Sequence, residues 1–192
     1  MIPIYDTVPG RNPPIATWAI LLANCGMFLL EISLPEHGLE RLFYLFGIVP
    51  ARYTHPEWAA YVGFPVDNYW PFLTSMFLHG GWFHILVNMW TLWIFGNNVE
   101  DRMGPGRFLL FYLTCGIAAG VVHLLTNPTS TVPTVGASGA IAGVMLKIMD
   151  TGLSNRCASS AGSRSRITAR PAIRPTPRPR APQSLAQPKA MY

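Results

Sequence analysis

Residues 72–95 form an unbroken run that contains no Asp, Glu, Lys or Arg. Two further stretches, about 13–30 and 108–126, also lack all four of these residue types. A helix needs roughly 20 predominantly apolar residues to cross the hydrocarbon core of a bilayer. The three stretches therefore predict membrane-spanning helices, and we expect an all-α, multi-pass integral membrane protein lying in the lipid bilayer.

The composition favours a membrane protein over a soluble domain. Half of the 192 residues are hydrophobic, 12% are charged, and the chain contains six Trp, seven Tyr and ten Phe. The three cysteines, Cys25, Cys115 and Cys157, are scattered, so they indicate neither a disulfide framework nor a metal site. We expect free thiols.

The net charge of +5 hides two unlike regions. Residues 1–149 carry six basic and eight acidic side chains, giving −2, whereas residues 150–192 carry eight and one, giving +7. The second region holds seven Arg and six Pro and cannot bury enough apolar surface to offset its ordering entropy. We expect a membrane domain over 1–149 and a disordered basic tail over 150–192. A polyanion-binding tail is the alternative, but its arginines are spread among prolines, and no nucleic-acid partner is expected.

The segment 31–71, between the first two expected helices, is rich in aromatic residues. Amphipathic rings prefer the headgroup region of a bilayer, so we expect an interfacial loop that lies on or dips into one leaflet. A small soluble cap is the alternative. The aromatic residues are Phe43, Tyr44, Phe46, Trp58, Tyr61, Tyr69 and Trp70.

The charges between the expected helices predict their orientation. A turn is expected at 96–107, and its Arg102 and Arg107 favour the cytoplasmic side, whereas 127–133 has no Lys or Arg. The amino terminus is then expected to be cytoplasmic.

A fourth helix is expected at about 135–149. Its 15 or so residues would extend roughly 22 Å, less than the hydrocarbon thickness of about 30 Å. Small residues four apart let helices approach closely. Such pairs occur in the third and fourth helices as Gly116 with Gly120 and Gly139 with Gly143.

Polar side chains in the second expected helix are candidates for function. His84 and Asn88 are four residues apart, about 40° around a helix, and so share a face, while His79 points roughly 140° away from His84. Side chains of these types can stabilise the oxyanion of an acyl-transfer intermediate. The alternative is that they only join helices by hydrogen bonds.

Ser138 is a candidate nucleophile within Gly136-Ala-Ser-Gly-Ala140. A reactive serine in a membrane needs a cavity that admits water. The run is not the nucleophile elbow of soluble hydrolases, because Ala140 stands where that motif needs glycine. Taken alone, Ser138 is better explained as a small packing residue than as a nucleophile.

Taken together, these motifs resemble the rhomboid family of intramembrane serine proteases, over about residues 13–145. They occur in the family's order as WPFLTSMFLH (70–79), HGGWFHILVN (79–88), GNNVE (96–100) and GASGAIAGV (136–144). The resemblance implies a six-helix bundle that cleaves transmembrane or juxtamembrane protein segments without a metal or cofactor. It implies Ser138 as nucleophile and His84 with Asn88 as the oxyanion-stabilising pair.

The chain departs from the family pattern after about Val144. In the family the general base is a histidine on the sixth helix, and this sequence has no histidine beyond His123. A serine without its base is a weak nucleophile. We therefore expect about four of six helices, a truncation or frame change near Val144, and an inactive site. His37 and His55 fall in the first loop, and nothing in the sequence brings His123 within the roughly 3 Å that proton transfer needs.

A catalytically dead, rhomboid-like protein that binds transmembrane clients is the alternative function. The first loop and the second helix could still contact a client segment without cleaving it.

Overall fold

The computed structural model describes residues 13–65 and 67–150. Most of these residues are helical, and no β-strand forms among them; Ile48 and Thr134 make an isolated antiparallel bridge. The all-α class is therefore confirmed. The tail expected at 150–192 lies outside the described residues except for Asp150, so its disorder stays a prediction.

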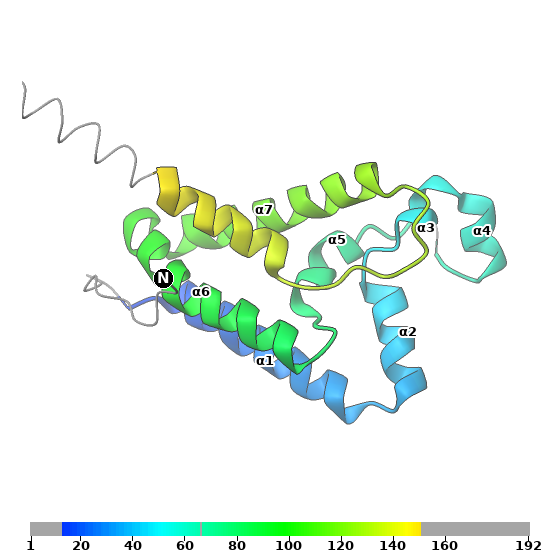
Figure 1. Ribbon diagram of the computed structural model, residues 1–192, viewed down its shortest axis with the longest axis horizontal. Helices are drawn as coiled ribbons and strands as arrows, with labels where there is room; N and C mark the ends of the chain where they lie inside the picture. The colour runs from blue at the N-terminus through cyan, green and yellow to red at the C-terminus, as the bar shows by residue number, and fades with distance from the viewer. Residues whose placement is uncertain (1–12, 66, 151–192) are drawn as a thin grey trace, which may run out of the picture. The chain divides into compact units, whose positions relative to one another are not determined.

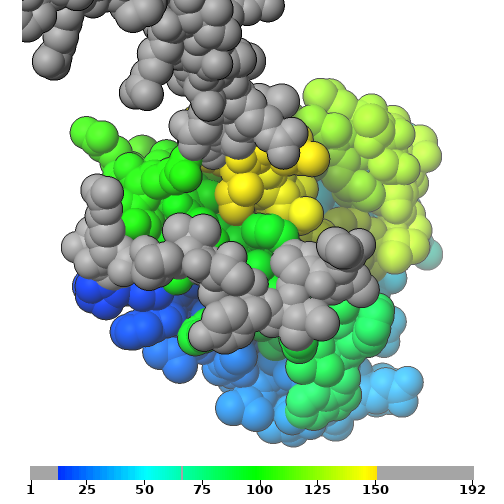
Figure 2. Space-filling view, turned by 60° about the vertical axis from the view of Figure 1, so that its left-hand side comes forward, coloured from blue at the N-terminus to red at the C-terminus, as the bar shows by residue number. Residues whose placement is uncertain are grey.

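The long helices form one packed group. They are α1 (Ile15–Ser33), α6 (Trp82–Met103), α7 (Pro105–Thr126) and a helix over 138–150, drawn in yellow in Figure 1. Helices α1 and α7 are long and apolar enough to cross a membrane, judged by length and composition. In Figure 2 helix 138–150 lies between α6 (green) and α7 (yellow-green). The buried core they enclose includes Ile20, Met76, Leu92, Phe108, Tyr112, Ile141 and Val144.

The expected helix 72–95 is divided in the structure, which corrects its bounds. A short helix α5 (Pro71–Thr74) and a 3-10 turn η1 (Ser75–Phe77) come first, and α6 begins only at Trp82. The break coincides with Gly80 and Gly81, and Gly81 has a φ of 156°. Glycine tolerates such backbone at little cost, so the chain leaves the helix here although the surrounding residues are apolar.

The turn expected at 96–107 is also corrected. Helix α6 continues through this polar stretch to Met103, and the turn is reduced to Gly104 with a φ of 81°, followed by Pro105 at the start of α7. The first helix is longer than expected as well, since α1 runs past Glu31 to Ser33. The acidic residues Glu31 and Glu100 do not end these helices, because each carboxylate accepts hydrogen bonds from backbone N–H groups elsewhere in the chain.

Helices α1 and α6 run antiparallel and are joined at both ends by a buried carboxylate. At one end, Glu100 of α6 accepts hydrogen bonds from the backbone N–H groups of Ala16 and Thr17, at 2.9 and 2.8 Å, and from the Thr17 hydroxyl at 2.7 Å. These N–H groups begin α1 and have no partner within the helix. Gly96 lets the helices meet, because a β-carbon there would lie 3.1 Å from Thr17 Oγ1.

The small-residue pairs lie at close contacts, as their spacing predicted. A β-carbon on Gly116 would meet the Met76 side chain, and one on Gly120 would lie 2.6 Å from Ile48 Cδ1. On helix 138–150 the glycines face α7, since β-carbons on Gly139 and Gly143 would meet Ala119 and Cys115. Their missing side chains bring the helix that begins with Ser138 against α7.

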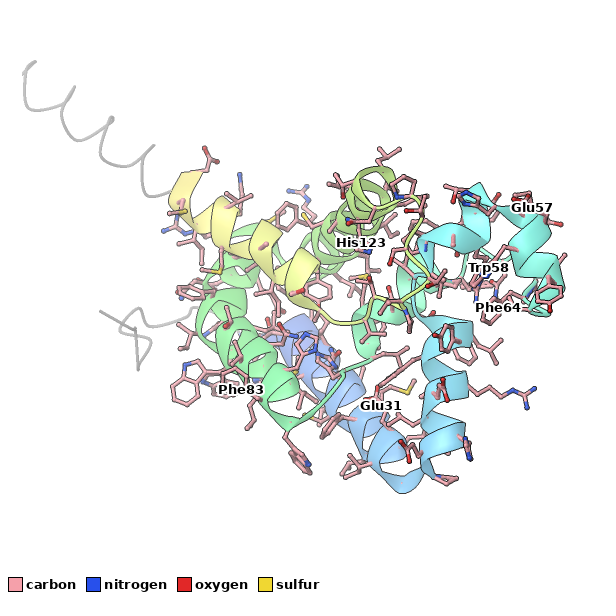
Figure 3. The ribbon with its side chains drawn as sticks, turned by 45° about the vertical axis from the view of Figure 1, so that its right-hand side comes forward. Glu31, Glu57, Trp58, Phe64, Phe83 and His123 are labelled. Carbon is pink, nitrogen blue, oxygen red and sulfur yellow. The ribbon has the colours of Figure 1, made fainter. Side chains whose placement is uncertain are left out.

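The aromatic loop is folded around a buried arginine. It contains α2 (Glu36–Phe46), α3 (Pro50–Thr54) and α4 (Pro56–Tyr61). Arg52 is fully buried, donates to the backbone carbonyls of Tyr44 and Leu45, and lies 4.8 Å from the centre of the Phe64 ring. Trp58 packs against the same ring at 5.9 Å (Figure 3). Whether this loop lies at the membrane interface stays a prediction.

Candidate active site

Ser138 is the first residue of helix 138–150 and is exposed. The turn before it is fixed to the segment that leads into α6, because the backbone N–H of Gly136 donates to the carbonyl oxygen of Ser75 at 2.8 Å. The first N–H groups of a helix have no acceptor within it and carry partial positive charge. The Ser138 hydroxyl therefore lies beside backbone donors that suit an anion.

His84 and Asn88 meet the turn that carries Ser138. Gly136 has a φ of 123°. A β-carbon built on it would lie 2.6 Å from both Cε1 and Nε2 of His84 and 3.8 Å from Nδ2 of Asn88. These two side chains share the face of α6 that contacts the turn, two residues before Ser138. The structure thus brings His84 and Asn88 to the turn that precedes Ser138.

The Asn88 amide has a free donor. Asn88 is 5% exposed, and its Nδ2 has no hydrogen-bond partner among the described residues. A buried donor without an acceptor is uncommon and costs free energy, because its hydration is lost. An oxygen that becomes negative during a reaction would supply the acceptor that Asn88 lacks.

The sequence predicted that His79 and His84 share one helix, but the structure places His79 before that helix begins. It belongs to the break before α6, is 1% exposed, and packs its ring edge-on against the His84 ring at 5.2 Å between centroids. Its backbone N–H donates to both carboxylate oxygens of Glu31, at 3.0 and 3.2 Å. This role of Glu31 could not be predicted from the sequence, because a charge at the end of an apolar run indicates only that the run stops.

His123 lines the same cavity as Ser138. The cavity has a volume of about 220 Å³ and extends between α7 and the turn that precedes helix 138–150. His123, labelled in Figure 3, hydrogen-bonds through Nε2 with Thr134 Oγ1 at 2.7 Å. Thr134 pairs through its backbone with Ile48 of the aromatic loop. Among the described residues no hydrogen bond joins His123 to Ser138; through Thr134 this histidine instead connects the end of α7 to the segment before helix 138–150.

The cluster can do part of an acyl transfer. An imidazole and an amide donor lie at the turn that leads into the helix beginning with Ser138, and groups of these types suit a tetrahedral oxyanion. Over 13–65 and 67–150 no histidine is hydrogen-bonded to Ser138 as a general base would be. Within the same ranges, no three His, Cys, Asp or Glu side chains converge as a metal site requires.

Comparison with known proteins assigns the family. The family model described as the Rhomboid domain matches residues 66–161, half of the chain. The chain belongs to the rhomboid family. This segment contains Ser138, His84 and Asn88, so the rhomboid match covers every residue of the cluster.

Curated relatives agree with this assignment. Rhomboid protease GluP of Bacillus subtilis (strain 168) is 41% identical over 145 residues, which are 76% of this chain and 26% of GluP. Rhomboid-like protein 11, chloroplastic, of Arabidopsis thaliana is 34% identical over 125 residues, 65% of this chain and 38% of that protein. YdcA of the same Bacillus strain is 33% identical over 134 residues, 70% of this chain and 60% of YdcA. The rhomboid chain thus spans between about a quarter and three-fifths of the lengths of these relatives.

Proposed function

We propose that this rhomboid chain carries the nucleophile and the oxyanion-binding groups of an intramembrane serine endopeptidase site. The observation that supports this most directly is the contact of the His84 ring and the Asn88 amide with Gly136, two residues before Ser138. The substrate class would be a transmembrane or juxtamembrane segment of another protein.

The proposed reaction assigns a role to each group. Ser138 Oγ attacks the carbonyl carbon of the scissile peptide bond while its proton passes to a base, and the carbonyl oxygen becomes the oxyanion. His84, Asn88 and the first N–H groups of helix 138–150 donate to that oxyanion. Collapse of the intermediate expels the amine, which takes the proton from the base. Water then hydrolyses the acyl-serine and regenerates Ser138.

The base has to come from outside the described cluster. His123 is engaged with Thr134, and the sequence has no later histidine. Loss of a member of such a catalytic group lowers kcat by several orders of magnitude. We therefore propose that the 192 residues alone have little peptidase activity, and that a segment bearing the base completes the site.

A serine-directed fluorophosphonate probe tests the assignment of the nucleophile. The 192-residue chain would be placed in lipid nanodiscs, alone and with a co-expressed segment of GluP that follows the aligned region. We expect labelling in the complemented sample that Ser138→Ala abolishes and Ser130→Ala preserves, since Ser130 lies in the loop 127–137. Equal labelling of wild type and Ser138→Ala would refute the proposed role.

A second candidate function is the binding of transmembrane clients without cleavage. Its support is the outward face of α6, where large aromatic side chains are exposed and Phe83 projects away from the neighbouring helices (Figure 3). They are Trp82, Phe83, Trp90 and Trp93, with exposed fractions of 62, 81, 54 and 59%. A photo-crosslinkable transmembrane peptide that attaches equally to wild type and Ser138→Ala, and is never cut in the complemented sample, would favour this function.

We also propose that the amino terminus faces the cytoplasm. Arg102 and Arg107 flank the junction of α6 and α7, whereas the loop after α7 carries no Lys or Arg over 127–133. Single cysteines at Gly106 and Thr131, in a background without native cysteines, would react with a membrane-impermeant maleimide from opposite sides. Reaction of both from one side would contradict the proposal.

A further inference from the structure

Glu31 is a buried carboxylate that the proposed reaction does not use. It lies in the last turns of α1, is 1% exposed, and accepts a hydrogen bond from the His79 backbone N–H with both oxygens. Ionisable groups inside a membrane-type helix are costly and call for a specific partner. Here the partner is one backbone group in the segment that leads into the site.

The His79 N–H belongs to the break that sets where α6 begins. Residues 78–81 connect η1 to α6, and among them Gly80 and Gly81 have no side chains to hold the backbone in place. His84 is the third residue of α6. The Glu31 carboxylate therefore holds the backbone three residues before α6 begins.

The His79 side chain adds a second connection to His84. Its ring lies edge-on to the His84 ring at 5.2 Å with an interplanar angle of 65°. Both ring nitrogens of His79 are buried, and neither has a hydrogen-bond partner among the described residues. The ring thus acts on His84 by packing. The His84 ring also lies close to Gly136, since a β-carbon built there would be 2.6 Å from its Cε1 and Nε2.

We propose that Glu31 is a positioning residue for the site: its carboxylate holds His79, and His79 holds the His84 ring against the turn that carries Ser138. Glu31 touches neither the substrate nor the reacting atoms. The catalytic consequence rests on the proposed function, whereas the positioning of His84 does not.

Glu100 provides a matched control. It is likewise a buried carboxylate, 2% exposed, that joins α1 to α6 through backbone N–H groups. Its partners are Ala16 and Thr17, at the opposite end of the helix pair from His84. A loss of fold stability should follow from substitution at either carboxylate, but a change at His84 should follow only from substitution at Glu31.

Histidine NMR tests the positioning itself. The 192-residue chain with ring-labelled histidine would be recorded in nanodiscs as wild type, Glu31→Ala, Glu31→Gln and Glu100→Gln, with the His84 signals assigned from His84→Asn. We expect the His84 ring signals to shift and broaden in Glu31→Ala, to shift less in Glu31→Gln, which keeps one acceptor oxygen, and to stay in place in Glu100→Gln. Unchanged His84 signals in both Glu31 variants, or equal shifts in Glu100→Gln, would overturn the proposal.

Probe kinetics test the consequence for Ser138. In the complemented sample Glu31→Ala should slow fluorophosphonate labelling about 10-fold, Glu31→Gln should recover part of the rate, and Glu100→Gln should stay within about 2-fold of wild type, since small misplacements of catalytic groups are costly. If wild-type Ser138 is not labelled at all, the proposed function fails while the NMR result still decides the role of Glu31. If wild type is labelled and all variants react equally, the role of Glu31 fails alone.

Discussion

Each end of the α1–α6 pair contains a buried carboxylate, but the two carboxylates have different partners. At one end Glu100 satisfies the first N–H groups of α1, and at the other Glu31 holds the His79 N–H before α6. The Glu100 end is made of helix backbone and close packing at Gly96. The Glu31 end lies next to His84, Asn88 and the Ser138 turn. Glu100 thus joins two helices, whereas Glu31 holds a break in the chain and is, in our proposal, a positioning residue for His84.

The largest difference in Ser138 labelling is expected between substitutions of Gly136, next to the site, and Gly96, at the Glu100 end of the helix pair. Gly136→Ala places a β-carbon 2.6 Å from the His84 ring on a backbone with φ of 123°, so both strain and collision act on the site. We expect Ser138 labelling in the complemented chain to fall at least about 100-fold, the order of losing an oxyanion donor. Gly96→Ala, at the other end, should lower stability and leave the labelling rate of the folded fraction within about 2-fold.

Rates are to be normalised to folded protein, measured by size-exclusion recovery. A Gly136→Ala variant that labels as fast as Gly96→Ala would remove the distinction between the two ends.

Asn88→Ala should produce the next largest effect on the site. Its unpartnered Nδ2 donor is the side-chain group that an oxyanion would engage, and loss of such a donor costs about 100-fold in rate. Thermal stability should hardly change, since that nitrogen has no partner to lose. Thr17→Ala, which removes the hydroxyl donor to Glu100, is the control and should show the reverse pattern of stability loss with normal labelling. Equal labelling of Asn88→Ala and wild type would remove Asn88 from the site.

The features of the fold that could be predicted from the sequence are those that depend on neighbouring residues. The spans at α1 and α7, the shared face of His84 and Asn88, and the contacts of the paired glycines follow from apolar runs and helical spacing, which are local. The helix bounds near residues 78–81 and 96–103 do not, because Glu100 and Glu31 find their partners 84 and 48 residues away. An isolated charge indicates where an apolar run ends, and only the fold reveals what it binds.

The residues of the candidate site could be predicted from the order of the motifs, but the contacts that bring them into place could not. Nothing local to the sequence indicates that His79 leaves the helix, that its ring packs on His84, or that His123 bonds to Thr134 across the cavity. These contacts depend on where the break before α6 and the loop after α7 come to lie, which tertiary packing decides.

Substitution of Glu100 should lower the free energy of unfolding more than substitution of Glu31, whereas Ser138 labelling should be more sensitive to Glu31. Glu100→Ala leaves two backbone donors and a hydroxyl without their acceptor, and we expect it to lower the free energy of unfolding by about 3 kcal/mol. Glu31→Ala leaves one backbone donor and should cost about 1–2 kcal/mol. Reversible unfolding in mixed detergent micelles would measure both. A larger loss for Glu31→Ala would mean that Glu31 is the main structural clamp.

The smallest expected difference concerns His79. Because its ring nitrogens have no partner among the described residues, the ring should act on His84 through shape. His79→Phe should slow Ser138 labelling less than His79→Ala, about 3-fold against about 10-fold, since small misplacements of catalytic groups are costly. If the two variants are equally slow, the nitrogens matter and the packing explanation is wrong.

Complementation of the Ser138 site tests the central claim most directly. The chain would be co-expressed with a GluP segment that follows the aligned region, and fluorophosphonate labelling would be compared between the native segment and one in which every histidine is replaced by alanine. We predict that Ser138 is labelled rapidly only when the segment keeps its histidines, and not at all in Ser138→Ala. Labelling that is equally fast without the segment's histidines, or that persists in Ser138→Ala, would contradict the claim that this chain holds the nucleophile and oxyanion-binding groups of a rhomboid site.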